Sequence, residues 1–194
     1  IMATDPDADR LGIYVKDSTE IWKDTEFAAD PAYPYVRFNA NMTGALIAEY
    51  VCREQKAVGK LPANGAICNT VVSTNLTKAI AENYNLKYIE TLTGFKYIGE
   101  QILLFEKNNT YKFIFGMEES FGCLVGDYTR DKDACAAVVI LCEIAAFYKL
   151  QGETICNAME EVYHKYGYYF EGAFGITLKG VDGAAQIKEM MENF

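Results

Sequence analysis

The apolar residues of this chain switch repeatedly between the spacing of a strand and the spacing of a helix. Short runs rich in β-branched and aromatic residues predict strands at residues 11–15, 66–72, 87–92 and 111–117. After the last three of these runs, apolar side chains recur three and four positions apart, as they do on one face of a helix. Strands that alternate with helices indicate an α/β fold, with a mainly parallel or mixed sheet flanked by helices.

Capping residues and breakers set the expected ends of these elements. Asn41 is expected to cap a helix that runs to about Arg53, and Ser73 or Thr74 is expected to cap the next one. Four later helices are predicted. One ends near residue 107, the next ends at residue 150, a third lies after residue 153, and the last begins near residue 183. The remaining segments are predicted to be irregular at 16–38, a polar loop at 118–130 and strand-like at 168–174.

The longest apolar stretch, at residues 134–150, contains Glu143 and is too short to cross a bilayer, so it predicts a buried core helix. Cys135 and Cys142 lie within it and are expected to be small core residues. None of the six cysteines forms a C-x-x-C pair, so zinc-binding and thioredoxin-like classes have no support. This cysteine usage favours a reducing compartment, and we expect a cytoplasmic protein with no membrane partner.

Length and charge narrow the function classes further. The 194 residues suit one large or two small domains. The formal net charge of −9 argues against a nucleic-acid partner, because binding to a phosphate backbone requires a basic face. A small anionic ligand stays possible, since a few lysines and arginines can make a local positive pocket. The opening Ile-Met-Ala-Thr-Asp looks like the end of a strand whose first residues are missing, so we expect a piece of a longer protein.

An acidic loop precedes the first predicted strand. Asp5, Asp7 and Asp9 stand at alternate positions, so three carboxylates can converge on one cation. Oxygen ligands of this kind suit Mg²⁺, Mn²⁺ or Ca²⁺. An EF-hand is excluded, because Arg10 and Lys16 stand where that loop requires glycine and glutamate. The alternative is a solvated acidic turn with Arg10 as its counter-ion.

Three further polar segments follow predicted strands, where ligands bind in parallel sheets. Thr93-Gly94-Phe95-Lys96 offers close backbone approach, a helix N-terminus and a positive charge, or is a plain turn. Glu118-Glu119-Ser120-Phe121-Gly122 places two adjacent acids after an apolar strand, either as acceptors for sugar hydroxyls or as an exposed turn. In Arg130-Asp131-Lys132-Asp133, Lys132 is a candidate phosphate contact or proton donor, or part of a solvated charge run.

Taken in this order and spacing, these loops resemble the α-D-phosphohexomutases, the phosphoglucomutase and phosphomannomutase enzymes. The metal loop of that family typically reads D-G-D-x-D-R, and this chain has DPDADR. The resemblance implies that Asp5, Asp7 and Asp9 are Mg²⁺ ligands and that Arg10 faces the phosphate. Pro6 replaces the usual glycine, which should stiffen the loop without removing a ligand.

The same resemblance assigns the sugar contacts. The family's sugar loop reads G-E-E-S in glucose-type members and G-E-M-S in dual-specificity members, and this chain has GMEESFG. By that match, Glu118, Glu119 and Ser120 bind sugar hydroxyls, with Arg130 as a further substrate contact. The stretch Thr93, Gly94, Phe95 and Lys96 is similar to the family's T-G-W/F-K loop, which faces the sugar. Lys132, within RDKDA, matches the proposed general acid/base.

The resemblance also implies an organisation and a reaction. Residues 1–40 would be the end of domain 2, residues 41–165 the sugar-binding domain 3, and residues 166–194 a linker or edge leading to domain 4. In the parent enzyme, a phosphoserine phosphorylates glucose 1-phosphate, and the bisphosphate returns its other phosphate to leave glucose 6-phosphate. Mg²⁺ is the expected cofactor, and glucose 1,6-bisphosphate the activator of the parent enzyme. The serine loop of domain 1 and the phosphate loop of domain 4 are missing, so this segment alone is expected to be inactive.

Three alternatives stay open. The parent could be a phosphomannomutase or a phosphopentomutase. The segment could be a non-catalytic module that binds sugar phosphate. A metal-dependent phosphatase, in which Asp5 or Asp7 is the nucleophile, is the third possibility.

Overall fold

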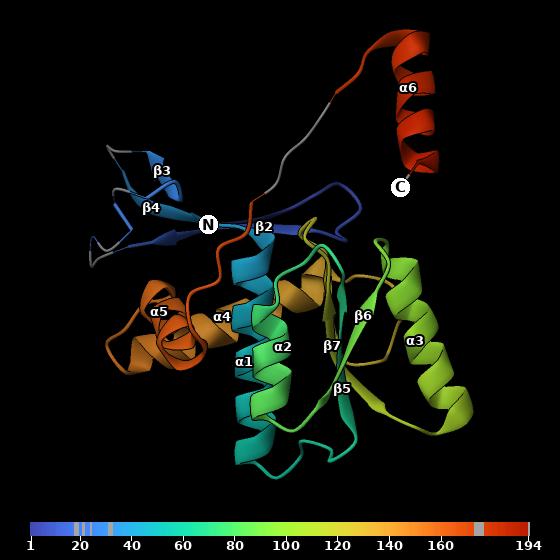
Figure 1. The fold of residues 1–194 in the computed structure, drawn as a ribbon. Coiled ribbons are helices and arrows are strands. Elements are labelled where there is room, and N and C mark those ends of the chain that lie inside the picture. The colour runs from blue at the N-terminus through green and yellow to red at the C-terminus, as the bar shows by residue number, and fades with distance from the viewer. Residues whose placement is uncertain (18–19, 21, 24, 31–32, 173–176, 194) are drawn as a thin grey trace.

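Two four-stranded sheets and six helices make up the part of the chain that the computed structural model describes, residues 1–17, 20, 22–23, 25–30, 33–172 and 177–193 (Figure 1). The antiparallel first sheet has the order β1 (Met2–Thr4), β2 (Leu11–Lys16), β4 (Tyr33–Phe38) and β3 (Ala28–Asp30). The second sheet has the order β6 (Lys87–Thr91), β5 (Gly65–Thr70), β7 (Lys112–Met117) and β8 (Cys123–Val125). Its first three strands are parallel and β8 is antiparallel, which confirms the predicted mixed α/β fold.

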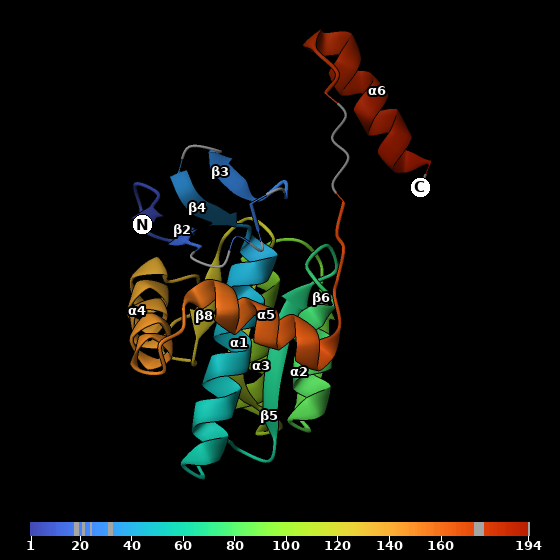
Figure 2. The same cartoon turned by 90° about the vertical axis from the view of Figure 1, so that its left-hand side faces the viewer.

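Six helices accompany the two sheets in the described residues, and three of them cover the faces of the second sheet (Figure 1). The six are α1 (Ala40–Ala57), α2 (Leu76–Asn83), α3 (Phe95–Asn108), α4 (Ala134–Leu150), α5 (Ile155–Tyr166) and α6 (Gly180–Glu192). The strands β5, β6 and β7 lie between α1 and α2 on one side and α3 on the other (Figure 1). The predicted face of α3, with Ile98, Ile102 and Phe105, packs on the sheet, while α6 stands apart from the rest of the fold in both views (Figure 2).

The first sheet shares the main hydrophobic core. Leu11, Ile13, Val36 and Phe38 belong to the same buried cluster as residues of α1, α2, α4 and α5. The first sheet therefore shares one continuous core with these helices, and burial of the apolar surface between them stabilises both parts.

A buried carboxylate joins three helical segments. Glu49 of α1 accepts hydrogen bonds from the hydroxyls of Tyr84 (2.8 Å) and Tyr166 (2.6 Å) and from the ammonium of Lys165 (2.8 Å). Burial raises the pKa of Tyr84 and of Tyr166, and the Glu49 carboxylate adds to the effect. Buried charges are tolerated when they are paired and hydrogen-bonded in this way.

Strands occur in two segments that the sequence predicted to be irregular. Within residues 16–38, β4 pairs with β2 from Tyr35 to Phe38, with Val15 opposite Val36. Pro34 does not break this strand, because its carbonyl still accepts from the amide of Asp17 at 2.8 Å. Within residues 118–130, β8 pairs with β7. It is only three residues long, which is too short for a periodic signal.

The caps differ from the prediction. Asn39 caps α1, and its side chain accepts from the amide of Met42, whereas Asn41 lies inside the first turn. The residue before α2 is Asn75, which makes no side-chain cap bond, although Thr74 accepts from the amide of Leu76 at 3.1 Å. Asn39 and Asn41 are both good capping residues, so composition alone could not choose between them.

Cys135 and Cys142 are exposed, so their assignment to the core was wrong. The buried side of α4 carries Ala134, Ala137, Leu141, Ile144 and Tyr148 instead. A helix that is apolar on all sides does not reveal which side is buried, and Val139 on the outer side is 64% exposed.

The last part of the chain is only partly as predicted. Helix α5 is present, but residues 168–172 form no strand, and 173–174 lie outside the described residues. Helix α6 begins at Gly180, three residues before the predicted start. Among the described residues, no single helix is long and apolar enough to cross a membrane; α4 and α5 pass such a test only as a pair that is bent by 90°.

Candidate functional site

The candidate residues gather where the parallel strands of the second sheet end. The loop between β1 and β2 lies over the carboxyl ends of β5 and β7 (Figure 1). Main-chain hydrogen bonds hold it there: the amide of Leu11 donates to the carbonyl of Phe121, and the amide of Ala134 donates to the carbonyl of Ala8. An isolated antiparallel bridge also joins Arg10 to Gly122. The acidic loop, the loop after β7 and the start of α4 thus form one unit.

The three aspartates of the acidic loop converge as their alternate spacing predicted. One carboxylate oxygen from each of Asp5, Asp7 and Asp9 lies within 4.8 Å of the others. Asp5 accepts from the amides of Asp9 and Arg10 and from Arg10 Nε at 2.8 Å. The Arg10 side-chain hydrogen bond holds the pKa of Asp5 well below its usual range. Asp5 is therefore anionic and fixed, while Asp7 at the tip is exposed.

The donor set fits a hard divalent cation. All three side chains offer oxygen, which Mg²⁺ and Ca²⁺ prefer. Oδ1 of Asp9 is buried and has no hydrogen-bond partner among the described residues, with Arg10 Nε at 3.5 Å as its ion-pair neighbour. A buried carboxylate oxygen left in this state is costly unless something charged binds it.

Lys132 links the acidic loop to the loop after β7. Its Nζ lies 2.8 Å from Oδ2 of Asp9 and 3.1 Å from Oδ1 of Asp131. Partial burial lowers the pKa of Lys132, but its hydrogen bonds with Asp9 and Asp131 outweigh burial and raise it above its ordinary value. A Cβ at Gly122 would lie 2.3 Å from Cδ of Lys132, so only glycine leaves room for this side chain. The ring of Phe95 lies beneath the ammonium, 5.8 Å away.

The two adjacent glutamates differ sharply. Glu118 is only 6% exposed, yet no hydrogen bond or ion pair joins its carboxylate to any residue in the described ranges. Burial raises the pKa of Glu118, which the ammonium of Lys132 offsets in part and the neighbouring carboxylates of Glu119, Asp131 and Asp9 reinforce. The Glu118 carboxylate, which has no such partner among the described residues, is free to accept a hydrogen bond from water or from a ligand.

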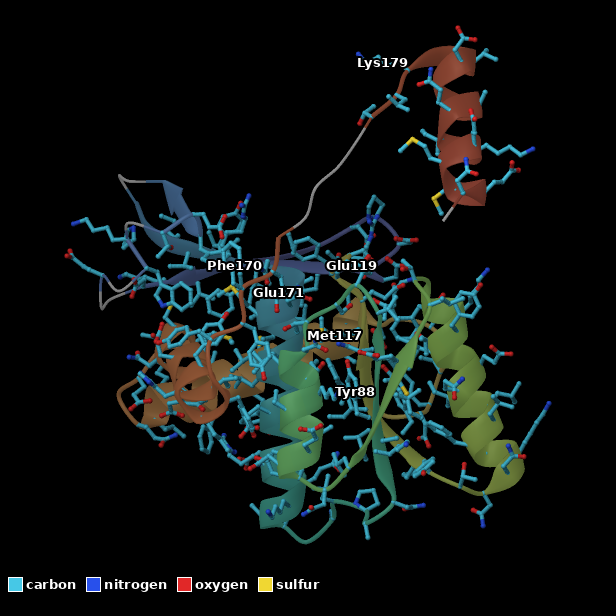
Figure 3. All side chains as sticks on the ribbon, viewed as in Figure 1. Tyr88, Met117, Glu119, Phe170, Glu171 and Lys179 are labelled. Carbon is cyan, nitrogen blue, oxygen red and sulfur yellow. The ribbon has the colours of Figure 1, made fainter. Side chains whose placement is uncertain are left out.

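Glu119 is instead tied to the loop after β5. Its Oε2 accepts from the hydroxyl of Thr70 at 3.0 Å and from that of Ser73 at 3.4 Å, and these hydroxyls lie 2.7 Å apart. Figure 3 shows Glu119 beside the end of β5. Sequence reasoning did not assign Thr70 or Ser73 to the site. The signal was present, because their loop follows a strand at the same sheet edge.

The predicted residues of the loop before α3, and Ser120, differ in how exposed they are at this edge of the sheet. Gly94, with φ of 119°, precedes α3, and Phe95 is buried in the core beneath that helix. Thr93, Lys96 and Ser120 are exposed at the same edge, and Lys96 lies over the ring of Tyr97.

Arg130 is directed away from the cluster. Its guanidinium pairs with Glu106, in the carboxyl-terminal half of α3, and donates to the carbonyls of Asp127 and Thr129. Arg130 lines a pocket together with Lys96, but no hydrogen bond or ion pair joins its guanidinium to the acidic loop, Lys132 or Glu118 among the described residues.

A known protein family matches the part of the chain that forms the second sheet and its helices. The family model described as phosphoglucomutase/phosphomannomutase, alpha/beta/alpha domain III, matches residues 39–166. The chain belongs to this family.

Relatives within the phosphoglucomutase/phosphomannomutase family cover the whole chain. The phosphoglucomutase of Staphylococcus aureus strain N315 is 33% identical over 195 aligned positions, which are 100% of this chain and 32% of that protein. The chain thus spans about a third of the length of the curated relatives it matches.

Solved structures share the fold. A phosphomannomutase candidate from Thermus thermophilus has a TM-score of 0.60 at 23% identity, over 86% of this chain and 30% of that one. The Paramecium phosphoglucomutase pp63/parafusin, in its open form, has a TM-score of 0.60 at 20% identity, over 86% of this chain and 24% of that one.

Proposed function

We propose that this chain supplies the metal loop and the sugar-recognition loop of an enzyme that interconverts glucose 1-phosphate and glucose 6-phosphate. The observation that carries the proposal is the convergence of the acidic loop, Lys132 and the unpartnered Glu118 at one sheet edge. A phosphoryl group needs positive charge beside it, and a sugar hydroxyl needs an acceptor. Both are available here within one rigid group of loops.

Each side chain has a proposed role. Asp5, Asp7 and Asp9 would hold Mg²⁺, which neutralises charge on the transferring phosphoryl group when it is bound. Lys132 hydrogen-bonds a phosphoryl oxygen and is the candidate general acid/base. Glu118 accepts a hydrogen bond from a sugar hydroxyl.

In the proposed reaction, a phosphoserine outside this chain transfers its phosphoryl group to the 6-hydroxyl of glucose 1-phosphate. The hydroxyl gives its proton to the general base, for which Lys132 in its neutral form is the candidate, its oxygen bonds to the phosphorus, and the bond from phosphorus to the serine oxygen breaks. The bisphosphate then turns over and its 1-phosphoryl group returns to the serine, which leaves glucose 6-phosphate. The sugar must be held in both orientations, and Glu118 can serve both because a carboxylate accepts from hydroxyls in several directions.

The proposal is tested by calorimetric binding of glucose 6-phosphate to the chain in MgCl₂. Glu118→Gln should weaken binding about tenfold or more, as expected for loss of a charge-assisted hydrogen bond. Asp7→Asn should remove the dependence on Mg²⁺. Glu82→Gln, an exposed carboxylate on α2 with no described side-chain partner, is the matched control.

Three outcomes would count against the proposal. One is equal binding by the Glu118→Gln variant. Another is tighter binding of mannose 1-phosphate or ribose 5-phosphate, which would move the assignment to a phosphomannomutase or a phosphopentomutase. Steady turnover by this chain alone would contradict the expected role of the outside serine.

A further inference from the structure

A pocket of about 540 Å³ lies away from the candidate site. It opens between the segment before β3, the end of β4 with the cap of α1, and α5 with the segment that follows it. None of its lining residues belongs to the acidic loop, the β7–β8 loop or the start of α4. Its size is that of a small-molecule site.

Half of the twelve residues that line it are aromatic, namely Trp22, Phe27, Tyr163, Tyr168, Tyr169 and Phe170. Trp22 and Tyr163 are ordered by ring contacts: their centroids lie 6.2 Å apart, and Tyr163 stacks on Tyr168 at 4.9 Å. The faces and edges that these contacts leave uncovered border the pocket, and the faces of aromatic rings are electron-rich. Phe170 and Glu171 lie on the segment above the amino-terminal end of α1 (Figure 3).

The charged residues of the pocket are mostly acidic. Glu26, Glu160 and Glu171 line it, against a single guanidinium, that of Arg37. Burial raises the pKa of Tyr163, and the carboxylates of Glu171 and Glu160 add to the effect, so both acids lie near the same ring. The pocket therefore repels anions such as sugar phosphates and attracts cations.

Two of its carboxylates are held in place. Glu160 accepts from the hydroxyl of Tyr168 at 2.8 Å, and Glu171 accepts from Nδ2 of Asn41 at 3.3 Å. Each carboxylate has further lone pairs for a ligand. The hydroxyl of Tyr163, a residue only 9% exposed, has no hydrogen-bond partner in the described part of the chain.

We propose that this pocket binds a small organic cation, an ammonium group on a compact apolar body. Its rings would contact the methyl or methylene groups and the positive charge, and Glu160 and Glu171 would balance that charge. Aromatic walls combined with carboxylates are the usual means of recognising substituted ammonium groups.

The test uses a pair of probes that differ only in charge. Choline carries a trimethylammonium group, and 3,3-dimethyl-1-butanol is its neutral counterpart of the same shape. Trp22 is the only tryptophan of the chain, so its fluorescence reports on this pocket directly. Choline should give a saturable change, with a Kd on the order of 1 mM, and the neutral probe should give none at the same concentration.

Variants then test the carboxylates. Glu171→Gln and Glu160→Gln should each weaken choline binding about two- to fivefold, while Glu82→Gln on the outer surface of α2 should leave it unchanged. Equal binding of the neutral probe would overturn the cation assignment, as would unchanged affinity in both pocket variants. No saturable signal with choline would overturn the site itself. Glucose 6-phosphate should not compete, and competition would contradict the separation of the two sites.

Discussion

The adjacent glutamates of the β7–β8 loop should respond in opposite directions to the same change. Glu118 is buried without a hydrogen-bonding or ion-pair partner among the described residues, whereas Glu119 accepts from the hydroxyls of Thr70 and Ser73. Replacing Glu118 by glutamine keeps its shape and removes the charge. We therefore expect Glu118→Gln to raise the free energy of unfolding at pH 7 and Glu119→Gln to lower it.

The magnitudes follow from the contacts. An unpaired buried polar group costs about 1–3 kcal/mol, and the ammonium of Lys132 offsets part of that for Glu118. We expect a gain of about 0.5–1 kcal/mol for Glu118→Gln. Glu119→Gln converts two charge-assisted hydrogen bonds into neutral ones, with an expected loss of about 1 kcal/mol. For a chain of this length, 1 kcal/mol shifts the Tm by about 2–4 °C.

The pH dependence provides a second criterion. Because the pKa of Glu118 is raised in the folded state, its protonated form stabilises the wild-type protein at low pH. That contribution is complete below the ordinary glutamate pKa of about 4.3 and is lost as the pH rises through the raised value. The advantage of Glu118→Gln should therefore be largest at neutral pH and shrink as the pH falls to about 4.

Urea unfolding of both variants beside the wild type, at pH 7 and near pH 4, measures these differences directly. A loss of more than about 1 kcal/mol for Glu118→Gln at pH 7 would refute the reasoning, because it would mean that the carboxylate has a stabilising partner within the fold.

Two further substitutions test the frame around the site. Glu49→Gln leaves at least one of the three donors that surround this carboxylate poorly satisfied. It should therefore lower the free energy of unfolding, measured by urea titration, by about 1–3 kcal/mol. A loss no larger than that of Glu82→Gln would contradict the buried network. Gly122→Ala forces Lys132 away from Asp9, so it should reduce calorimetric binding of glucose 6-phosphate about tenfold and change the free energy of unfolding by about 1 kcal/mol or less. Unchanged binding with a large loss of stability would show that Lys132 has only a structural role.

The periodic elements were readable from the sequence because their apolar residues face one core. The spacing of Ile98, Ile102 and Phe105 identified α3 and its buried side correctly. The segments that sequence reasoning missed depend on contacts between residues far apart in the chain. Val36 faces Val15 across β2 and β4, and nothing within residues 16–38 signals that pairing.

In the candidate site, too, contacts within one loop could be predicted from the sequence, and contacts between distant residues could not. The convergence of Asp5, Asp7 and Asp9 followed from their alternate positions within one loop. The partners of Glu119 did not, since Thr70 lies 49 residues away. The direction of Arg130 was equally hidden, because its guanidinium is placed by Glu106, 24 residues earlier in the chain.

The acidic loop and the β7–β8 loop are aligned by backbone atoms. The amide of Leu11 donates to the carbonyl of Phe121, and the amide of Ala134, at the start of α4, donates to the carbonyl of Ala8. Every residue except proline supplies such an amide. Most side chains on either loop, Gly122 excepted, can therefore be exchanged over evolutionary time without loss of the spacing between the two loops. Proline at position 11 or 134 is the change that this arrangement tolerates least.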